Sequence, residues 1–103
     1  MLEAAETATE FADGRSRQDL DSDLKLVYAL VRCIEIVGEA AKGVSQPRRE
    51  RLDSLPWKDI CGMRDRLIHA YFDVDSDILW ATVQNDLPKV IEALREALEA
   101  GPD

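Results

Sequence analysis

The sequence predicts a single all-α domain over residues 1–103, an up-and-down bundle of four to five helices. Apolar residues recur at steps of three and four over long stretches, and no segment alternates apolar and polar residues as a strand does. Hydrophobic residues make up 46% of the chain and charged residues 33%, with 5 Gly and 4 Pro. This composition excludes disordered and low-complexity proteins. So small a bundle leaves apolar surface near solvent, and a partner subunit would help to stabilise it.

The start of the chain predicts a first helix from Leu2 to near Gly14. Ala and Glu dominate this stretch, and nothing breaks a helix before the glycine. The segment Arg15–Asp19 then predicts a polar connection. Asp21 or Ser22 can cap the next helix through a side-chain oxygen.

A second, long helix is expected from Leu24 to about Gly43. Two adjacent apolar seams run along it, Leu24-Val27-Val31-Ile34-Gly38-Ala41 and Leu26-Leu30-Cys33-Val37-Ala40-Val44. A helix that is apolar over so wide an arc belongs in the centre of a bundle. The small residues Gly38, Ala40 and Ala41 would let another helix approach closely at that level.

The middle of the chain predicts a short helix and then a third long one. Pro47 suits the first turn of a short helix that runs through Leu52. Ser54, followed by Pro56, restarts the chain as a helix from Pro56 to about Tyr71. The candidate chemistry of the protein lies on this third long helix.

The end of the chain predicts a last helix, preceded by a polar turn and a cap at Asp73, Asp75 and Ser76. Its apolar positions follow a helical period: Ile78, Leu79, Val83, Leu87, Val90, Ile91, Leu94 and Leu98. Pro88 falls inside this pattern, so we expect it to kink or split the helix.

The charge of the chain limits how it could bind RNA. A net charge of −8 argues against a protein that holds RNA by bulk electrostatics. Only the middle is basic, since residues 45–69 carry 6 Lys and Arg against 4 Asp and Glu. Arg48, Arg49 and Arg51 are either a solvated helix face or the neighbourhood of a phosphate site.

The two cysteines and the lack of long apolar runs indicate where the protein works. Cys33 and Cys61 lie in helical patterns without close spacing, so we expect free thiols rather than a disulfide or a metal site. No run approaches the ~20 apolar residues of a membrane span, and the acidic start differs from a secretory leader. We therefore expect a cytoplasmic protein that does not enter a membrane.

One arginine lies inside the apolar stripe of the third long helix. At about 100° per residue, six side chains fall near one line of that helix: Trp57, Ile60, Arg64, Leu67, Ile68 and Tyr71. A lone guanidinium costs many kcal/mol to bury. Arg64 must therefore meet an acid, an interface or a phosphate, and Glu35 and Glu39 are the candidate acids.

His69 is the only histidine of the chain. It either fills the helix end or acts as a general acid or base, because the pKa of imidazole lies near neutrality. On a regular helix Arg64, Asp65 and His69 can line one edge. A lone histidine without close-spaced cysteine or carboxylate ligands does not make a zinc site, so we expect no metal and no cofactor.

The string Arg64-Asp65-Arg66-Leu67-Ile68-His69-Ala70-Tyr71 resembles the signature of HepT-like toxins, a family of the HEPN superfamily. The signature is Arg, four residues, His, any residue and Tyr. The resemblance extends through Glu35-Ile36-Val37-Gly38-Glu39-Ala40-Ala41, Leu55-Pro56-Trp57, Asp73-Val74-Asp75 and Val83-Gln84-Asn85-Asp86-Leu87-Pro88, about four fifths of the chain. Such proteins carry Asn or Asp after the arginine, and Asp65 here makes the local field more acidic.

The resemblance implies a HEPN-like homodimer in which the two motif-bearing helices meet at a shared cleft. It implies a metal-independent endoribonuclease, the toxin of a type VII-like toxin–antitoxin module, that cleaves RNA, with tRNA as one candidate. It assigns catalysis to Arg64 and His69, with Asp65 in support. A cognate minimal nucleotidyltransferase antitoxin, which can form higher oligomers with the toxin, would transfer AMP from ATP onto Tyr71 and silence it.

Two other interpretations stay open. The bundle could be a non-catalytic partner or scaffold of the nucleotidyltransferase, with Arg64 and His69 shaping the interface, and the acidic charge favours this. It could also be an ordinary helical dimer with no nucleic-acid role, in which Tyr71 is an amphipathic aromatic at the edge of the core. Arg, His and Tyr at this spacing favour the ribonuclease, since an interface alone does not require them.

Overall fold

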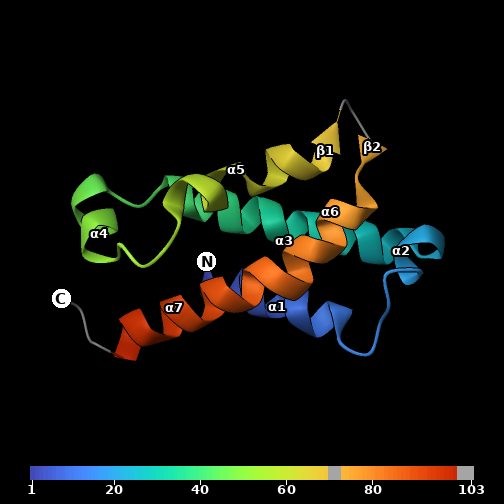
Figure 1. The fold of residues 1–103 in the computed structure, drawn as a ribbon, viewed down its shortest axis with the longest axis horizontal. Helices are drawn as coiled ribbons and strands as arrows, with labels where there is room; N and C mark the ends of the chain where they lie inside the picture. The colour runs from blue at the N-terminus through green and yellow to red at the C-terminus, as the bar shows by residue number, and fades with distance from the viewer. Residues whose placement is uncertain (70–72, 100–103) are drawn as a thin grey trace.

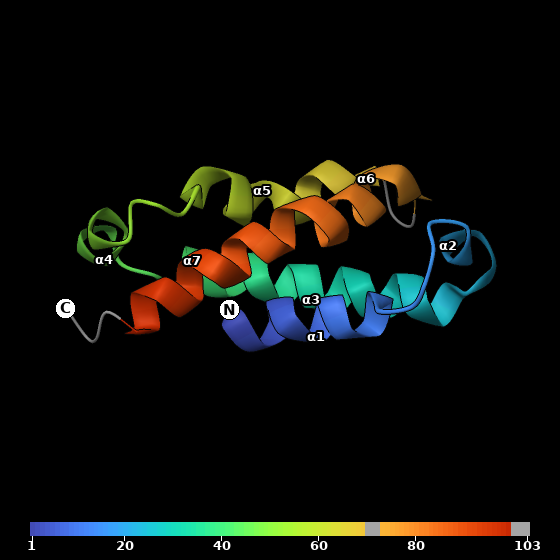
Figure 2. The same cartoon turned by 60° about the horizontal axis from the view of Figure 1, so that its bottom comes forward.

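The protein is an elongated helical bundle, about 44 × 29 × 16 Å, in a computed structural model that describes residues 1–69 and 73–99 (Figure 1). Its elements are α1 Leu2–Ala12, α2 Asp19–Ser22, α3 Leu24–Lys42, α4 Gln46–Arg51, α5 Trp57–Leu67, β1 Ile68–His69, β2 Asp73–Val74, α6 Ser76–Ala81, the π-helix η1 Thr82–Asp86 and α7 Leu87–Glu99. Successive long helices run up and down (Figure 2). The all-α bundle predicted from the sequence is confirmed, and α2 is added where a polar connection was expected.

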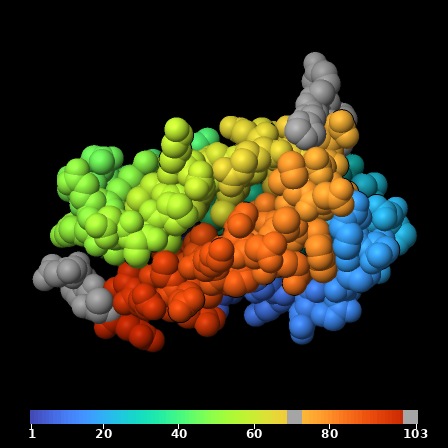
Figure 3. All heavy atoms as spheres, in the orientation of Figure 1, coloured from blue at the N-terminus to red at the C-terminus, as the bar shows by residue number. Residues whose placement is uncertain are grey.

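Helix α3 lies in the centre, because its two apolar seams face different neighbours. It packs on α1 along one side and on α5 along the other, while α7 packs on α1. The run α6–η1–α7 crosses one face of the molecule between these layers (Figure 3). The largest fully buried side chains come from α3, α5 and the run α6–η1–α7: Leu30, Ile34, Val37, Ile60, Leu67, Leu79, Val83 and Leu87.

The close approach predicted at Gly38 is present. A Cβ at Gly38 would lie 3.5 Å from the Ile60 carbonyl oxygen and 3.7 Å from that of Cys61, so α5 passes over the glycine with its backbone. These are ordinary van der Waals distances. The site therefore has room for one methyl group but not for a larger side chain.

The caps and breaks of the helices follow local chemistry. Gly14 has a positive φ of 72° just after α1, and Gly43 ends α3, both as expected. The cap of α3 is Asp23, whose Oδ1 accepts from the Leu26 N–H at 3.1 Å. The prediction of Asp21 or Ser22 is wrong because both residues belong to α2. Arg15 donates to Asp23 at 2.7 Å, and this contact is the main cause that lowers the pKa of Asp23.

Pro88 splits the last helix as predicted. A proline has no N–H to donate, and its ring clashes with the carbonyl four residues earlier. The backbone avoids that clash by widening, and the Leu87 N–H donates to Thr82, five residues back, within η1. Asp75 caps α6 through a hydrogen bond of 3.0 Å from the Ile78 N–H to its Oδ1.

The end of the third long helix differs from the prediction, which carried it to about Tyr71. The helix α5 ends at Leu67, because Ile68 takes an extended backbone (φ −111°, ψ 113°). Strand β1 pairs antiparallel with β2 in the register Ile68 with Val74 and His69 with Asp73. The Asp75 N–H donates to the Leu67 carbonyl at 2.7 Å. The short turn to α6 thus satisfies an acceptor that the helix end leaves unpaired.

Two further expectations concern thiols and membranes. Cys33 and Cys61 are free, as predicted, and burial raises the pKa of the Cys33 thiol. Among the described residues, no helix is both long and apolar enough to cross a membrane.

Substitutions at Gly38 should affect stability differently according to whether they add one methyl group or a larger side chain. Gly38→Ala should stabilise the fold by up to about 1 kcal/mol, because alanine is the better helix former and its Cβ fits. Gly38→Leu should destabilise it by about 1–3 kcal/mol, because α3 and α5 must separate. Urea unfolding followed by circular dichroism measures both changes, and equal effects of the two variants would contradict the close packing.

Candidate functional site

The candidate site lies where α5 ends. Helix α5 is anchored by its buried face, formed by Ile60, Met63 and Leu67. Arg64 follows Met63 and falls outside that face, with its side chain 50% exposed. In the stripe on which the sequence placed Arg64, Ile60 and Leu67 are buried, whereas Arg64 lies at the exposed edge. Half of the Arg64 side chain is therefore in contact with solvent.

Arg64 has one acidic neighbour from another helix. Its Nε lies 4.0 Å from Oε2 of Glu35 on α3, and its Nη1 donates to Asp65 Oδ1 at 3.4 Å. The predicted contact with Glu35 is thus present at the long limit of an ion pair. The alternative acid, Glu39, does not pair with it. A guanidinium held this loosely keeps most of its donors available for an anion.

The structure changes how His69 and Asp65 relate to Arg64. A regular helix would have placed all three residues on one edge, and this expectation is wrong because the helix ends before His69. The His69 backbone belongs to β1 and is paired with Asp73. The Asp65 side chain is 71% exposed and contacts only Arg64 among the described residues. The fourth predicted residue, Tyr71, lies outside the described residues.

Three exposed apolar side chains lie on α3, the helix that carries Glu35. Leu24, Tyr28 and Ile36 lie on α3 away from the core and are 61%, 55% and 37% exposed, respectively. Glu35, the neighbour of Arg64, lies between the last two along the same helix. We call Leu24, Tyr28 and Ile36 the outer face of α3. Sequence reasoning put Leu24 in a core seam and did not single out Tyr28 or Ile36, although both lie off the two seams.

The basic segment of α4 does not join this site. Figure 1 shows α4 at one end of the molecule and the β1–β2 pair at the other. Arg49 donates to the carbonyls of Ala41 and Val44 at 2.9 and 3.1 Å, and its guanidinium lies 5.5 Å from the centre of the Trp57 ring. Arg49 therefore closes the C-terminal end of α3. A phosphate site beside α4, one of the two alternatives left open by the sequence, would therefore be separate from the site at Arg64.

The donors of this site do not form a metal cluster. Within residues 1–69 and 73–99, no group of three His, Cys, Asp or Glu side chains could hold a metal ion. The site thus consists of a half-exposed guanidinium, one carboxylate from α3, one from α5 and the start of β1. Such a set can bind an anion.

The model of the ribonuclease HepT-like family matches residues 1–97. The chain belongs to this family. A protein of Caldanaerobacter subterraneus subsp. tengcongensis, named as a candidate RNase, is 39% identical over 99 residues, 96% of this chain and 88% of its own. A Thermococcus cleftensis protein named "Probable ribonuclease HepT" is 40% identical over 90 residues, 87% and 82% of the two chains.

A third relative of the HepT-like chain, from Methanocaldococcus jannaschii, is also named as a candidate RNase. It is 36% identical over 90 residues, 87% of this chain and 83% of its own. No solved structure matches the chain. The resemblance noted from the Arg64 to Tyr71 string is therefore confirmed as family membership.

The arginines of α4 should differ in what they do for this HepT-like fold. Arg49→Ala should lower the free energy of unfolding by about 1–3 kcal/mol, because two carbonyls lose a charged donor. Arg48→Ala should change it by less than about 0.5 kcal/mol, because Arg48 is exposed. Urea unfolding of both variants measures this difference. If Arg48→Ala proved the more harmful change, Arg49 would not be the residue that closes α3.

Proposed function

We propose that this chain is a metal-independent endoribonuclease, the toxin of a toxin–antitoxin module, with its site at the interface of a homodimer. Arg64 and His69 carry catalysis and Asp65 supports them. The observation that carries the proposal is Arg64, held half-exposed within the family's motif. The names of the relatives, which describe ribonucleases, support the same activity.

The chemistry of RNA cleavage fits these residue types. A ribose 2′-hydroxyl attacks the adjacent phosphorus, and the bond to the leaving 5′-oxygen breaks. The reaction needs a base for the hydroxyl, an acid for the leaving oxygen and positive charge on the phosphorane. His69 suits either proton transfer, and Arg64 can grip a phosphate with two parallel hydrogen bonds.

A dimer supplies what one chain lacks. The chain has 1 His, whereas a base and an acid are needed. Two copies related by a twofold axis would offer two copies of His69 and of Arg64 to one RNA strand. The outer face of α3 adjoins Arg64 through Glu35, so its apolar side chains are the surface we assign to this dimer.

The acidic charge of the chain fits a site that depends on local contacts. At a net charge of −8, long-range attraction cannot hold the substrate. The phosphate must be bound by placed groups such as Arg64, whose only acidic contacts among the described residues are at 3.4 and 4.0 Å. A phosphate oxygen can replace these contacts at low cost, because exposed ion pairs contribute little.

The activity test is cleavage of end-labelled tRNA and single-stranded RNA in EDTA by mass-verified, unmodified protein. Wild type should cleave, and His69→Ala should be about 10²–10⁴-fold slower because one proton transfer is lost. Arg64→Ala should be about 10²–10³-fold slower because the phosphorane loses its positive charge. The matched control is Arg66→Ala, since Arg66 lies on the same helix, 45% exposed, and should keep its activity.

The other outcomes decide between the interpretations. Equal cleavage by wild type and His69→Ala would remove His69 from the mechanism. Loss of activity on addition of EDTA would contradict metal independence. If unmodified wild type does not cleave either RNA but binds a nucleotidyltransferase, the chain is a non-catalytic partner subunit.

We further propose that Tyr71 is the site of silencing. A cognate nucleotidyltransferase would direct the Tyr71 phenolic oxygen onto the α-phosphorus of ATP, with pyrophosphate as the leaving group. The new phosphodiester would lie two residues after His69 and place negative charge where the RNA phosphate binds. An anion held there would compete with substrate for Arg64.

Modification should therefore follow Tyr71 alone. Co-expression with the nucleotidyltransferase should add one adenylyl group to the wild type, measured by intact-protein mass spectrometry, and abolish cleavage. Tyr71→Phe should keep the unmodified mass, whereas Tyr28→Phe, at the chain's other tyrosine, should be modified like the wild type. An adenylyl group on Tyr71→Phe, or an unchanged mass of the wild type, would rule out this regulation.

A further inference from the structure

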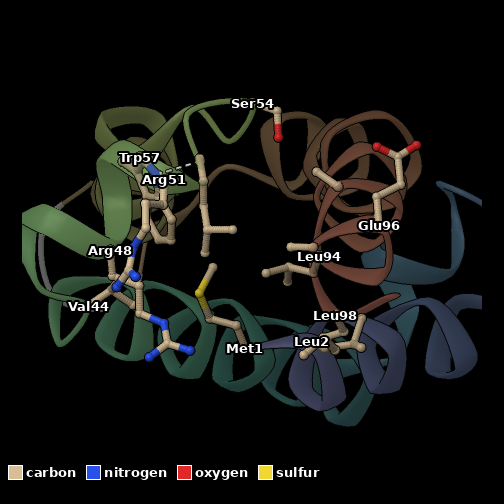
Figure 4. A pocket seen from close by; sticks show the side chains of 13 residues that line it. Met1, Leu2, Val44, Arg48, Arg51, Ser54, Trp57, Leu94, Glu96 and Leu98 are labelled. Atoms are coloured by element: carbon tan, nitrogen blue, oxygen red, sulfur yellow. Dashed lines mark hydrogen bonds between the residues drawn. The ribbon is translucent and has the colours of Figure 1, made fainter. Parts of the chain in front are cut away.

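A hollow lies at the end of the molecule away from the candidate site. It is a cleft of about 810 Å³ between α4 with the start of α5 on one wall and the second half of α7 on the other, and Met1 and Leu2 at the start of the chain also line it (Figure 4). We call it the α4–α7 cleft. Leu52 and Trp57 line the first wall, and Leu94 and Leu98 line the second. Leu98 is 68% exposed, so a substantial apolar surface is uncovered here.

The first wall of the cleft carries positive charge. Arg48 and Arg51 of α4 line it, and both are exposed. Neither forms an ion pair or a side-chain hydrogen bond with another described residue, unlike their neighbour Arg49. Arg48 and Arg51 can therefore bind carboxylates at the rim of an apolar surface.

The second wall is a helix with two distinct sides. Ala93 and Ala97 line the cleft one helical turn apart, so another helix could approach α7 closely there. Glu92, Glu96 and Glu99 lie along one edge of this wall, roughly 110° from the line through the two alanines on a regular helix, and Glu96 itself lines the cleft. All three are exposed, and none pairs with a described residue.

We propose that the cleft receives the end of α7 from a second copy of this chain. In this arrangement the two α7 helices meet along Ala93 and Ala97, and each lies between its partner's α7 and its partner's α4. The acidic side of each α7 then faces Arg48 and Arg51 of the other copy. One twofold axis thus brings the acidic wall of each copy against the basic wall of the other, as in an isologous interface.

The cleft and two turns of a helix have volumes of the same order. A helix about 10 Å across fills about 80 Å³ for each ångström of its length, so two turns need roughly 850 Å³. The cleft offers about 810 Å³. The part of α7 from Ala93 to Glu99 is two turns long and contains the alanines, the exposed leucine and two of the acids.

This contact is separate from the dimer proposed through the outer face of α3. Helix α3 does not line the cleft, apart from Val44 just after its end. A chain with both contacts forms tetramers when the two axes close a ring and longer assemblies when they do not. The proposal does not rest on ribonuclease activity.

The test uses two charge-reversed chains, each carrying Tyr28→Glu so that the outer face of α3 is blocked. One chain has Arg48→Glu with Arg51→Glu, and the other has Glu92→Arg with Glu96→Arg. The parent is the chain with Tyr28→Glu alone. Two copies of either reversed chain should repel each other at the cleft, and each should self-associate more than about tenfold more weakly than the parent. Their equimolar mixture should form heterodimers, because the walls of the first chain are then both acidic and those of the second are both basic. Sedimentation velocity and native mass spectrometry measure the species.

The matched control for the arginine variant is Lys42→Glu with Lys58→Glu, which makes the same change of net charge at exposed positions that do not line the cleft. It should associate like the parent, and circular dichroism checks that every variant is folded. A parent that stays monomeric up to about 1 mM would overturn the proposal. So would reversed chains that self-associate as strongly as the parent, or that fail to pair when mixed.

A small amphipathic anion is the competing occupant. Dodecanoate that changes Trp57 fluorescence in a parent chain that remains monomeric would make the cleft a small-molecule site and overturn the proposal. An effect of Tyr28→Glu on cleavage or on dimer formation, in contrast, bears only on the outer face of α3. The two proposals can therefore fail independently.

Discussion

The contact of α3 with α5 at Gly38 is the constraint on which the rest of the molecule depends. Because α5 crosses the glycine with its backbone, the two helices lie close enough to bury Ile34, Ile60 and Leu67 together. With α1 packed on the other side of α3, only one side of this central helix faces outward. That side carries Glu35, which reaches Arg64. The packing that forms the core thus also defines the surface on which the candidate site lies.

The termination of α5 has an equally direct effect on the site. The Leu67 carbonyl finds the Asp75 N–H instead of a donor in a further helical turn, and the chain reverses toward α6 within a few residues. Arg64 therefore stays on a rigid helix, while His69 belongs to the short β pair that follows. In the proposed reaction, Arg64 on the helix would bind the phosphate and His69 on the strand that follows would transfer protons.

The arginines show how neighbouring residues of one type take different tasks. Arg49 is tied to the carbonyls that end α3 and lies against Trp57, so it supports the fold. Arg48 and Arg51 extend from the same short helix without an acidic partner among the described residues. The positive charge of the middle of the chain is thus divided between both ends of the molecule. Under the two proposals, Arg64 at one end would bind the RNA phosphate and Arg48 with Arg51 at the other would contact a second copy of the chain.

The sequence by itself determined the all-α class, the central position of α3, the helix ends at Gly14 and Gly43, the break at Pro88 and the family motif from Arg64. These features depend on local periodicity, on backbone freedom or on residue identity, all of which are present in the linear chain. Only the tertiary structure decided the end of α5 at Leu67, the exposure of Arg64 and Leu24, and the role of Arg49. Each of these depends on a partner far along the chain, such as Asp75 for Leu67 or Glu35 for Arg64. Helical period cannot tell which apolar stripe a neighbouring helix covers, because that depends on how the helices pack.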